Sequence, residues 1–118
     1  MPLDPKAIPT PTVIRPAATK LSELPKDEQA IFKAIKKAII AERGKCAVYA
    51  AGSRVRGNPR ITEGNLSASS DFDIIITDVT IQEARALKAK IQPELSEKYS
   101  GLRIDIFTNI GITPNIPI

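Results

Sequence analysis

Histidine is absent from the sequence, and cysteine occurs once, as Cys46. Without histidine the chain has no imidazole base, no catalytic triad built on imidazole and no histidine-ligated zinc. A single cysteine excludes a disulfide within the chain. Any chemistry must therefore use carboxylates, hydroxyl groups, lysine, arginine or a metal ion held by oxygen.

Aromatic residues are also scarce, at 4% of the chain. So few rings argue against an extended surface on which the bases of single-stranded nucleic acid would stack. No apolar run is long enough to span a bilayer, and the N-terminal stretch MPLDPKAIPT lacks the apolar core of a signal peptide. The sequence as given carries no address for export and predicts no membrane partner.

The rest of the composition is that of an ordinary globular domain, with 118 residues, 42% hydrophobic and 25% charged. Five of the ten prolines fall before residue 20. Because proline fixes φ and removes a backbone donor, residues 1–24 are predicted to form an extended arm or linker, and residues 25–118 a single domain. The net charge of +4 favours a polyanionic partner only mildly.

Hydrophobic periodicity predicts the regular elements. Ile31, Ile35 and Ile39 recur at helical spacing, and Thr80 with Glu83 has the spacing of a capping box at the start of a second helix. The predicted helices are 26–43 and 81–99, and the predicted strands are 46–51, 72–77 and 102–108. Pro93 is expected to kink or restart the second helix.

The order helix, strand, strand, helix, strand predicts an α/β or α+β fold: a small mixed β-sheet with helices packed on one face. The tail 110–118 is apolar but contains two prolines. It is predicted to be an extended arm or to pair at an edge of the sheet.

Three aspartates are predicted to share one face of this sheet. Residues two apart on a strand point the same way, so Asp71 and Asp73 lie opposite the apolar Phe72, and Asp105 lies on the same side if its strand is a neighbour. A lone aspartate at a strand start would mark only the solvent edge. Three in phase repel one another unless a cation is present, and carboxylate oxygens suit Mg²⁺, with two ions expected.

A glycine-serine turn follows the first predicted strand. Gly52 lets the backbone approach an anion, and Ser53 is placed to cap a following helix whose amides would face phosphate. Arg54 and Arg56 add positive charge. Such turns are common in plain loops, and what strengthens this one is its position directly after a strand and before the aspartate pair.

The segments GSRVRG, SDFDIII and RIDIF together resemble the signature of the DNA polymerase β-like nucleotidyltransferase superfamily, particularly the minimal nucleotidyltransferases. The resemblance covers residues 47–107, about half of the chain. The residues that match its pattern are Gly52, Ser53, Ser70, Asp71, Asp73 and Asp105.

The resemblance implies an enzyme that transfers a nucleoside monophosphate from a nucleoside triphosphate such as ATP to an acceptor hydroxyl. Asp71 and Asp73 would hold Mg²⁺ and the triphosphate, and Asp105 would hold a second ion and help to activate the hydroxyl. Ser53 and the Gly52 backbone would bind the β- and γ-phosphates. Arg54 or Arg56 would assist them, and Ser70 is counted among the nucleotide-binding residues.

The loop 58–69 is longer than in compact members of this superfamily, which makes it a candidate for contact with the acceptor. The helical domain that often selects the acceptor is absent from the sequence given. RNA, including tRNA, and protein acceptors stay open. The expected settings are a toxin–antitoxin pair or a toxin module from a secreted effector. In either setting the protein would have a cognate toxin, antitoxin or immunity protein as its partner. It would act in the cytoplasm, or in the cytoplasm of a target cell if it belongs to a secreted effector.

Two other readings compete with this enzyme. The same fold can bind a nucleotide or a partner protein without transfer. Loss of one carboxylate would favour that reading, and all three are present. Alternatively, the chain is a plain structural domain whose acidic patch is a solvated sheet edge.

Overall fold

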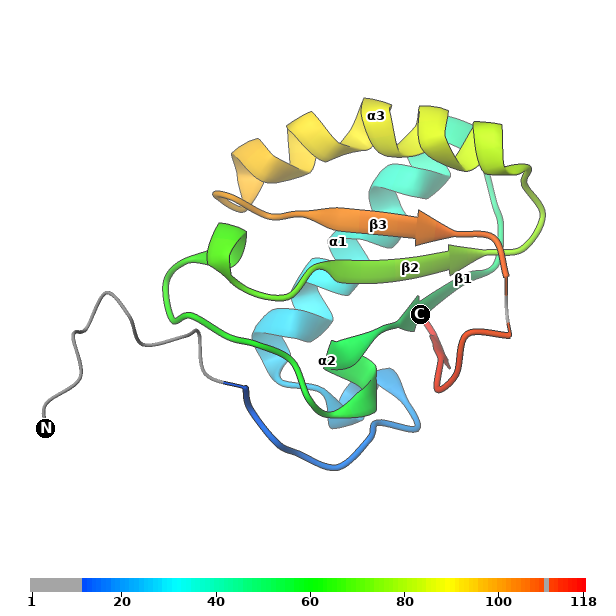
Figure 1. The fold of residues 1–118 in the computed structure, drawn as a ribbon. Coiled ribbons are helices and arrows are strands. Elements are labelled where there is room, and N and C mark those ends of the chain that lie inside the picture. The colour runs from blue at the N-terminus through cyan, green and yellow to red at the C-terminus, as the bar shows by residue number, and fades with distance from the viewer. Residues whose placement is uncertain (1–11, 110) are drawn as a thin grey trace, which may run out of the picture.

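The computed structural model describes residues 12–109 and 111–118. Its sheet has four strands in the order β3-β2-β1-β4 (Figure 1). β2 runs parallel to β3 and antiparallel to β1, and β4 pairs antiparallel with the other edge of β1. The mixed sheet and the α+β fold class predicted from the sequence are thereby confirmed. The strands are β1 Val48–Ala51, β2 Phe72–Ile76, β3 Ile104–Phe107 and β4 Ile116–Pro117.

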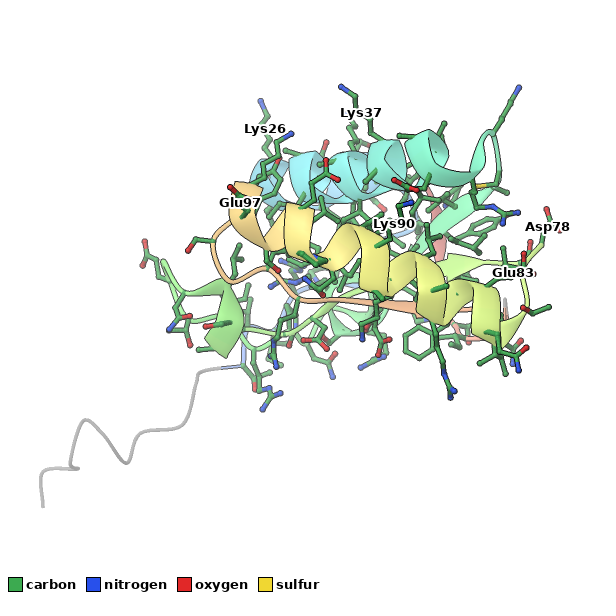
Figure 2. All side chains as sticks on the ribbon, turned by 90° about the horizontal axis from the view of Figure 1, so that it is seen from above. Lys26, Lys37, Asp78, Glu83, Lys90 and Glu97 are labelled. Carbon is green, nitrogen blue, oxygen red and sulfur yellow. The ribbon has the colours of Figure 1, made fainter. Side chains whose placement is uncertain are left out.

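Among the described residues, two long helices and three short ones complete the fold. The long helices pack on one face of the sheet, α1 behind it and α3 along its β3 side in the view of Figure 1. Lys26 and Lys37 extend from α1 away from the sheet (Figure 2). The helices are α1 Lys26–Arg43, the single turn α2 Ser53–Arg56 and α3 Ile81–Lys98, and the 3-10 turns are η2 Leu21–Glu23 and η3 Leu66–Ala68.

The core lies between this sheet face and the two long helices. Alternate residues of β2, Phe72, Ile74 and Ile76, are almost fully buried there. The ring of Phe72 meets that of Phe32 from α1 edge-on, with 5.0 Å between centroids. Since one face of β2 is fixed in the core, the residues between these three must point to the opposite face.

The predicted helices are observed almost to the residue. Thr80 and Glu83 form the capping box, with each backbone N–H donating to the other's side chain. Pro93 does not restart the second helix, because α3 continues through it, and the expected kink stays a prediction. Proline removes the hydrogen bond to the carbonyl of Ala89, and Ala89 is exposed, so water can satisfy that carbonyl.

The described part of the proline-rich arm belongs to the domain. Val13, Arg15 and Ala18 donate backbone hydrogen bonds to residues 59, 57 and 55. Ala18 and Leu24 are buried in the core. Residues 12–24 therefore line the turn that follows β1, whereas the prediction for residues 1–11 lies outside the described residues.

The C-terminal tail returns to the sheet. β4 pairs with β1, and the N–H of Ile118 donates to the carbonyl of Val48, so the predicted edge pairing is confirmed. Across the described residues, no helix combines the length and the apolar character needed to cross a membrane.

Candidate functional site

The three predicted aspartates converge on the sheet face that the helices leave uncovered. Asp73 and Asp105 are direct register partners on the parallel strands β2 and β3, and Asp71 lies just before β2. One carboxylate oxygen from each of the three lies within 4.8 Å of the others. The alternation of the two strands and their pairing thus produce the cluster expected from the sequence.

The cations around this cluster are placed at its two sides. Arg103 pairs with Asp71 at 3.2 Å and Lys88 pairs with Asp105 at 3.4 Å, and all four side chains are 39–53% exposed. Within the described part of the chain, Asp73 at the centre has no ion pair within 4 Å. The positive charges nearest to the cluster therefore leave its middle carboxylate uncompensated.

The pKa of Asp73 reflects this position. Burial of the carboxylate, then the negative charges of Asp71 and Asp105, raise the pKa of Asp73 from 3.8 to about 6. Arg56 and Arg54 oppose the rise in pKa without cancelling it. A divalent cation would reverse the balance, because it favours the charged form of every carboxylate that it touches.

The Gly52 turn lies directly against this carboxylate. Ala51, the last residue of β1, pairs with Asp73, so the chain leaves the strand next to the cluster. A Cβ atom at Gly52 would stand 1.9 Å from Oδ2 of Asp73, and the φ of Gly52 is +83°. Both the conformation and the space demand glycine here. The start of the turn and the Asp73 carboxylate therefore lie side by side.

The residues of the turn divide into two groups. Arg56 is exposed, and Ser53 is half-buried with no hydrogen-bond partner for its hydroxyl among residues 12–109 and 111–118. α2 is a single turn in which the N–H groups of Val55 and Arg56 bond to the Gly52 carbonyl. Ser53 is the first residue of that turn and not its cap, which differs from the sequence expectation.

Arg54 is directed away from the site. Its side chain is 3% exposed, pairs with Glu28 of α1 at 3.3 Å, and donates to the carbonyl of Ser70. The guanidinium also lies 3.9 Å from the centre of the Phe72 ring. The prediction that Arg54 assists in phosphate binding finds no support in this arrangement, which gives Arg54 a packing role and leaves Arg56 as the outward cation of the turn.

Ser70 is occupied by the neighbouring loop. Its hydroxyl accepts a hydrogen bond from the N–H of Arg60, and its own N–H donates to the carbonyl of Arg60. These bonds fix the residue before Asp71 and close the base of the loop 58–69. Ser70 therefore positions Asp71, and its hydroxyl proton stays available for a further acceptor.

Sequence reasoning missed Lys88 as a partner of the cluster. Arg103 could have been found, because it lies two residues before Asp105 on the same strand and must share its face. Lys88 comes from α3, and its spacing in the sequence gives no sign that it reaches the edge of β3.

The donor set fits a divalent cation of the Mg²⁺ type, which prefers hard oxygen ligands. Two oxygens on opposite sides of one octahedral Mg²⁺ are about 4.2 Å apart. The observed 4.8 Å limit is close to that span, so a small side-chain movement would let Asp71, Asp73 and Asp105 share ions.

Comparison of the chain with protein-family models, with curated proteins and with solved structures finds no significant match.

Proposed function

We propose that this protein is a metal-dependent nucleotidyltransferase. The observation that carries the proposal is the register pairing of Asp73 with Asp105, beside Asp71 and with the Gly52 backbone pressed against Asp73. In a purely structural domain, three like charges held together would only cost stability. So would a backbone conformation, such as that of Gly52, that other residues rarely adopt. The resemblance of GSRVRG, SDFDIII and RIDIF to minimal nucleotidyltransferases supports the same activity.

In this proposal the reaction joins an acceptor hydroxyl to the α-phosphorus of a nucleoside triphosphate. The new bond joins the acceptor oxygen to phosphorus, the bond to the bridging oxygen breaks, and pyrophosphate leaves. Asp105 accepts the hydroxyl proton. Bound Mg²⁺ would supply neutralisation of the charge that develops on the phosphate oxygens. Asp71 and Asp73 would hold those ions, with Asp105 as the third ligand.

The turn would hold the remaining phosphates. Ser53 can donate its hydroxyl, Gly52 admits the anion close to the backbone, and Arg56 supplies charge from the exposed side of α2. The acceptor is an RNA or a protein. A toxin module with a cognate antitoxin or immunity protein, acting in a cytoplasm, is the proposed setting.

The first test is titration with Mg-ATP and the other triphosphates, combined with thermal melts. A ligand that binds only the folded protein stabilises it by about 2.7 kcal/mol at a concentration of one hundred dissociation constants. Wild type should gain stability from Mg-nucleotide, and Asp73→Asn and Asp105→Asn should gain much less. Equal gains in all three proteins would contradict the three-carboxylate site.

The second test is transfer itself. The protein is incubated with α-labelled triphosphates, Mg²⁺, total RNA and cell lysate, and the labelled macromolecule is identified. Label should appear with wild type and disappear with Asp73→Asn. Nucleotide binding without any label would instead favour a non-catalytic nucleotide-binding module with the same fold.

A further inference from the structure

A cavity of about 390 Å³ opens beside Asp105, along the outer edge of β3. Its walls come from α3, from β3 and from the residues that follow β3. Asp105 belongs both to this wall and to the carboxylate cluster. Ligand pockets usually measure about 300–1,000 Å³, so this cavity has room for a group of nucleotide size next to the carboxylate.

The charges of the cavity favour an anion. Arg85 and Lys88 lie three residues apart on α3, which places them on one side of the helix. Asp105 is the single acidic side chain among the described residues that line the cavity. Arg85 has no ion pair within 4 Å in the part of the chain that the structure describes, so its charge is available.

Lys88 can change partners. Its contact with Asp105 is 3.4 Å long and both side chains are about 40% exposed, so this pair contributes little to stability. Ions bound at the carboxylates would take over Asp105. Lys88 would then be free for a phosphate in the cavity.

The remaining walls suit a base. Phe107 is half-buried and lines the cavity together with Ile106 and Ile112, and Ile81 at its rim is 60% exposed. Asn109 adds an amide that can bond to the edge of a base. One aromatic ring offers stacking for one nucleotide, which agrees with the scarcity of aromatic residues in the chain.

We infer that this cavity binds the terminal nucleotide of a single-stranded nucleic acid as the acceptor of the transfer. The inference rests on the proposed function, because it uses Asp105 as the group that takes the proton of the attacking hydroxyl. The phosphate of the terminal nucleotide lies at Arg85 and Lys88, its base lies on Phe107, and its free hydroxyl lies at Asp105.

Fluorescence anisotropy with a short single-stranded RNA of mixed sequence tests the cavity without requiring activity. Arg85→Ala should weaken binding about tenfold, since it removes a charge-assisted bond to phosphate. It should also reduce the salt dependence of binding by about 0.7 in the log–log slope. Phe107→Leu keeps the apolar volume but loses stacking, and we expect a loss of about fivefold or more.

Lys90→Ala is the matched control. The substitution removes the same charge from the same helix. The Lys90 side chain, however, pairs with Glu42 and lies between α3 and α1 (Figure 2). Its substitution should change the affinity less than about twofold, as expected for a charge outside the contact. Equal losses in Arg85→Ala and Lys90→Ala, or no loss in Arg85→Ala, would overturn the inference.

Asp105→Asn separates binding from reaction. Removal of a negative charge from the cavity should tighten RNA binding, whereas transfer should be lost. Weaker binding in this variant would contradict an anionic occupant.

Two further substrates identify the acceptor. A DNA strand of the same sequence shows whether the acceptor is RNA or DNA, and an RNA blocked at its terminal hydroxyl shows whether that hydroxyl is required. Labelling of RNA or DNA that requires the free hydroxyl and falls in Arg85→Ala supports the inference. Labelling of a protein, with nucleic acid unlabelled, overturns it and leaves the proposed function intact. A wild type that binds no Mg-nucleotide would refute the proposed function, and the anisotropy would still decide whether the cavity binds nucleic acid.

Discussion

Two groups of charged side chains lie on opposite faces of β2, and they balance their charges differently. On the helix side, Glu28 is 2% exposed and meets two arginines. Arg15 contacts it through two hydrogen bonds of 2.9 and 2.6 Å, and Arg54 through an ion pair of 3.3 Å. On the other side, three half-exposed aspartates have two cations at their flanks, and among the described residues no cation lies within 4 Å of Asp73.

The charges and hydrogen-bonding groups of Glu28, Arg15 and Arg54 are satisfied within the protein. Arg15 and Arg54 also bond to backbone carbonyls, and every buried side-chain nitrogen or oxygen in the described residues has a hydrogen-bond partner. Burial lowers the pKa of Arg54, and the charge of Glu28 opposes this change. A buried charge is tolerated only with such partners, so this group has a structural role.

The charges of the three aspartates are not balanced in this way by the described residues. The chain supplies two arginines for one glutamate in its interior but leaves Asp73 uncompensated where solvent and ligands can reach it. The lack of a positive charge at Asp73 therefore does not reflect a general shortage of cations in the protein. It is local to the sheet face where Gly52 lies against the Asp73 carboxylate, which favours a cation from solution as the missing partner.

The largest effect on this comparison is expected from Glu28→Ala. The change leaves Arg15 and Arg54 without their common carboxylate, and removal of one partner from a buried ion pair costs about 3–5 kcal/mol. The free energy of unfolding in urea measures the loss. A loss below about 1 kcal/mol would show that the buried group is no more tightly coupled than a surface pair.

The next largest effect is expected from Gly52→Ala, with Gly44→Ala as its control. Both glycines have nearly the same φ, +83° and +87°, but a Cβ at Gly44 meets nothing within 4 Å. Each substitution should lose about 1–3 kcal/mol from backbone strain. Gly52→Ala should lose more, because its Cβ collides with the Asp73 carboxylate. Equal losses in urea unfolding would show that Asp73 can move aside.

A smaller effect is expected from pH in the metal-free protein. The pKa of Asp73 is 3.8 in its ordinary state and about 6 in the fold, so the folded protein keeps a proton that the unfolded chain has lost between these values. The contribution of Asp73 to stability is therefore present below about pH 4 and is lost as the pH rises to about 6.

Melts of wild type and Asp73→Asn with a chelator, from pH 4 to pH 7, measure that contribution. The stability of wild type relative to the variant should fall across this range, and the variant should be as stable as wild type or slightly more so at neutral pH. A difference that does not change with pH would show that neither burial nor the neighbouring aspartates raise the pKa of Asp73 in the fold.

The aspartate cluster was predictable from the sequence, whereas the buried group was not. Strand alternation fixes which residues share a face, and a common position at the start of two neighbouring strands brings Asp73 and Asp105 together. No comparable rule links Glu28 to Arg15 and Arg54, which are 13 and 26 residues away. Their contact depends on how the arm and α1 pack around α2.

Arg54 shows the consequence. Arg54 directly follows a glycine-serine turn, so the sequence predicts that it assists phosphate binding, and its sequence neighbours give no sign of a buried glutamate. The cavity at Asp105 could not be predicted from the sequence either, because it forms where α3 meets the edge of β3 and the tail. Local pattern therefore predicts what lies on one strand, and packing between distant segments decides the rest.

The smallest effect is expected from Arg103→Ala. Arg103 pairs with Asp71 at the surface, where such pairs contribute about 0–1 kcal/mol. It also donates to the carbonyl of Ser69 at 3.1 Å, so a loss of a few tenths of a kcal/mol is expected in urea at low salt. Without this cation the repulsion at Asp73 should grow, and the fall in stability between pH 4 and pH 6 should become steeper. Added Mg²⁺ should reduce the difference between Arg103→Ala and wild type, because the ion replaces the lost charge. If Mg²⁺ leaves that difference unchanged, the three carboxylates do not share a cation.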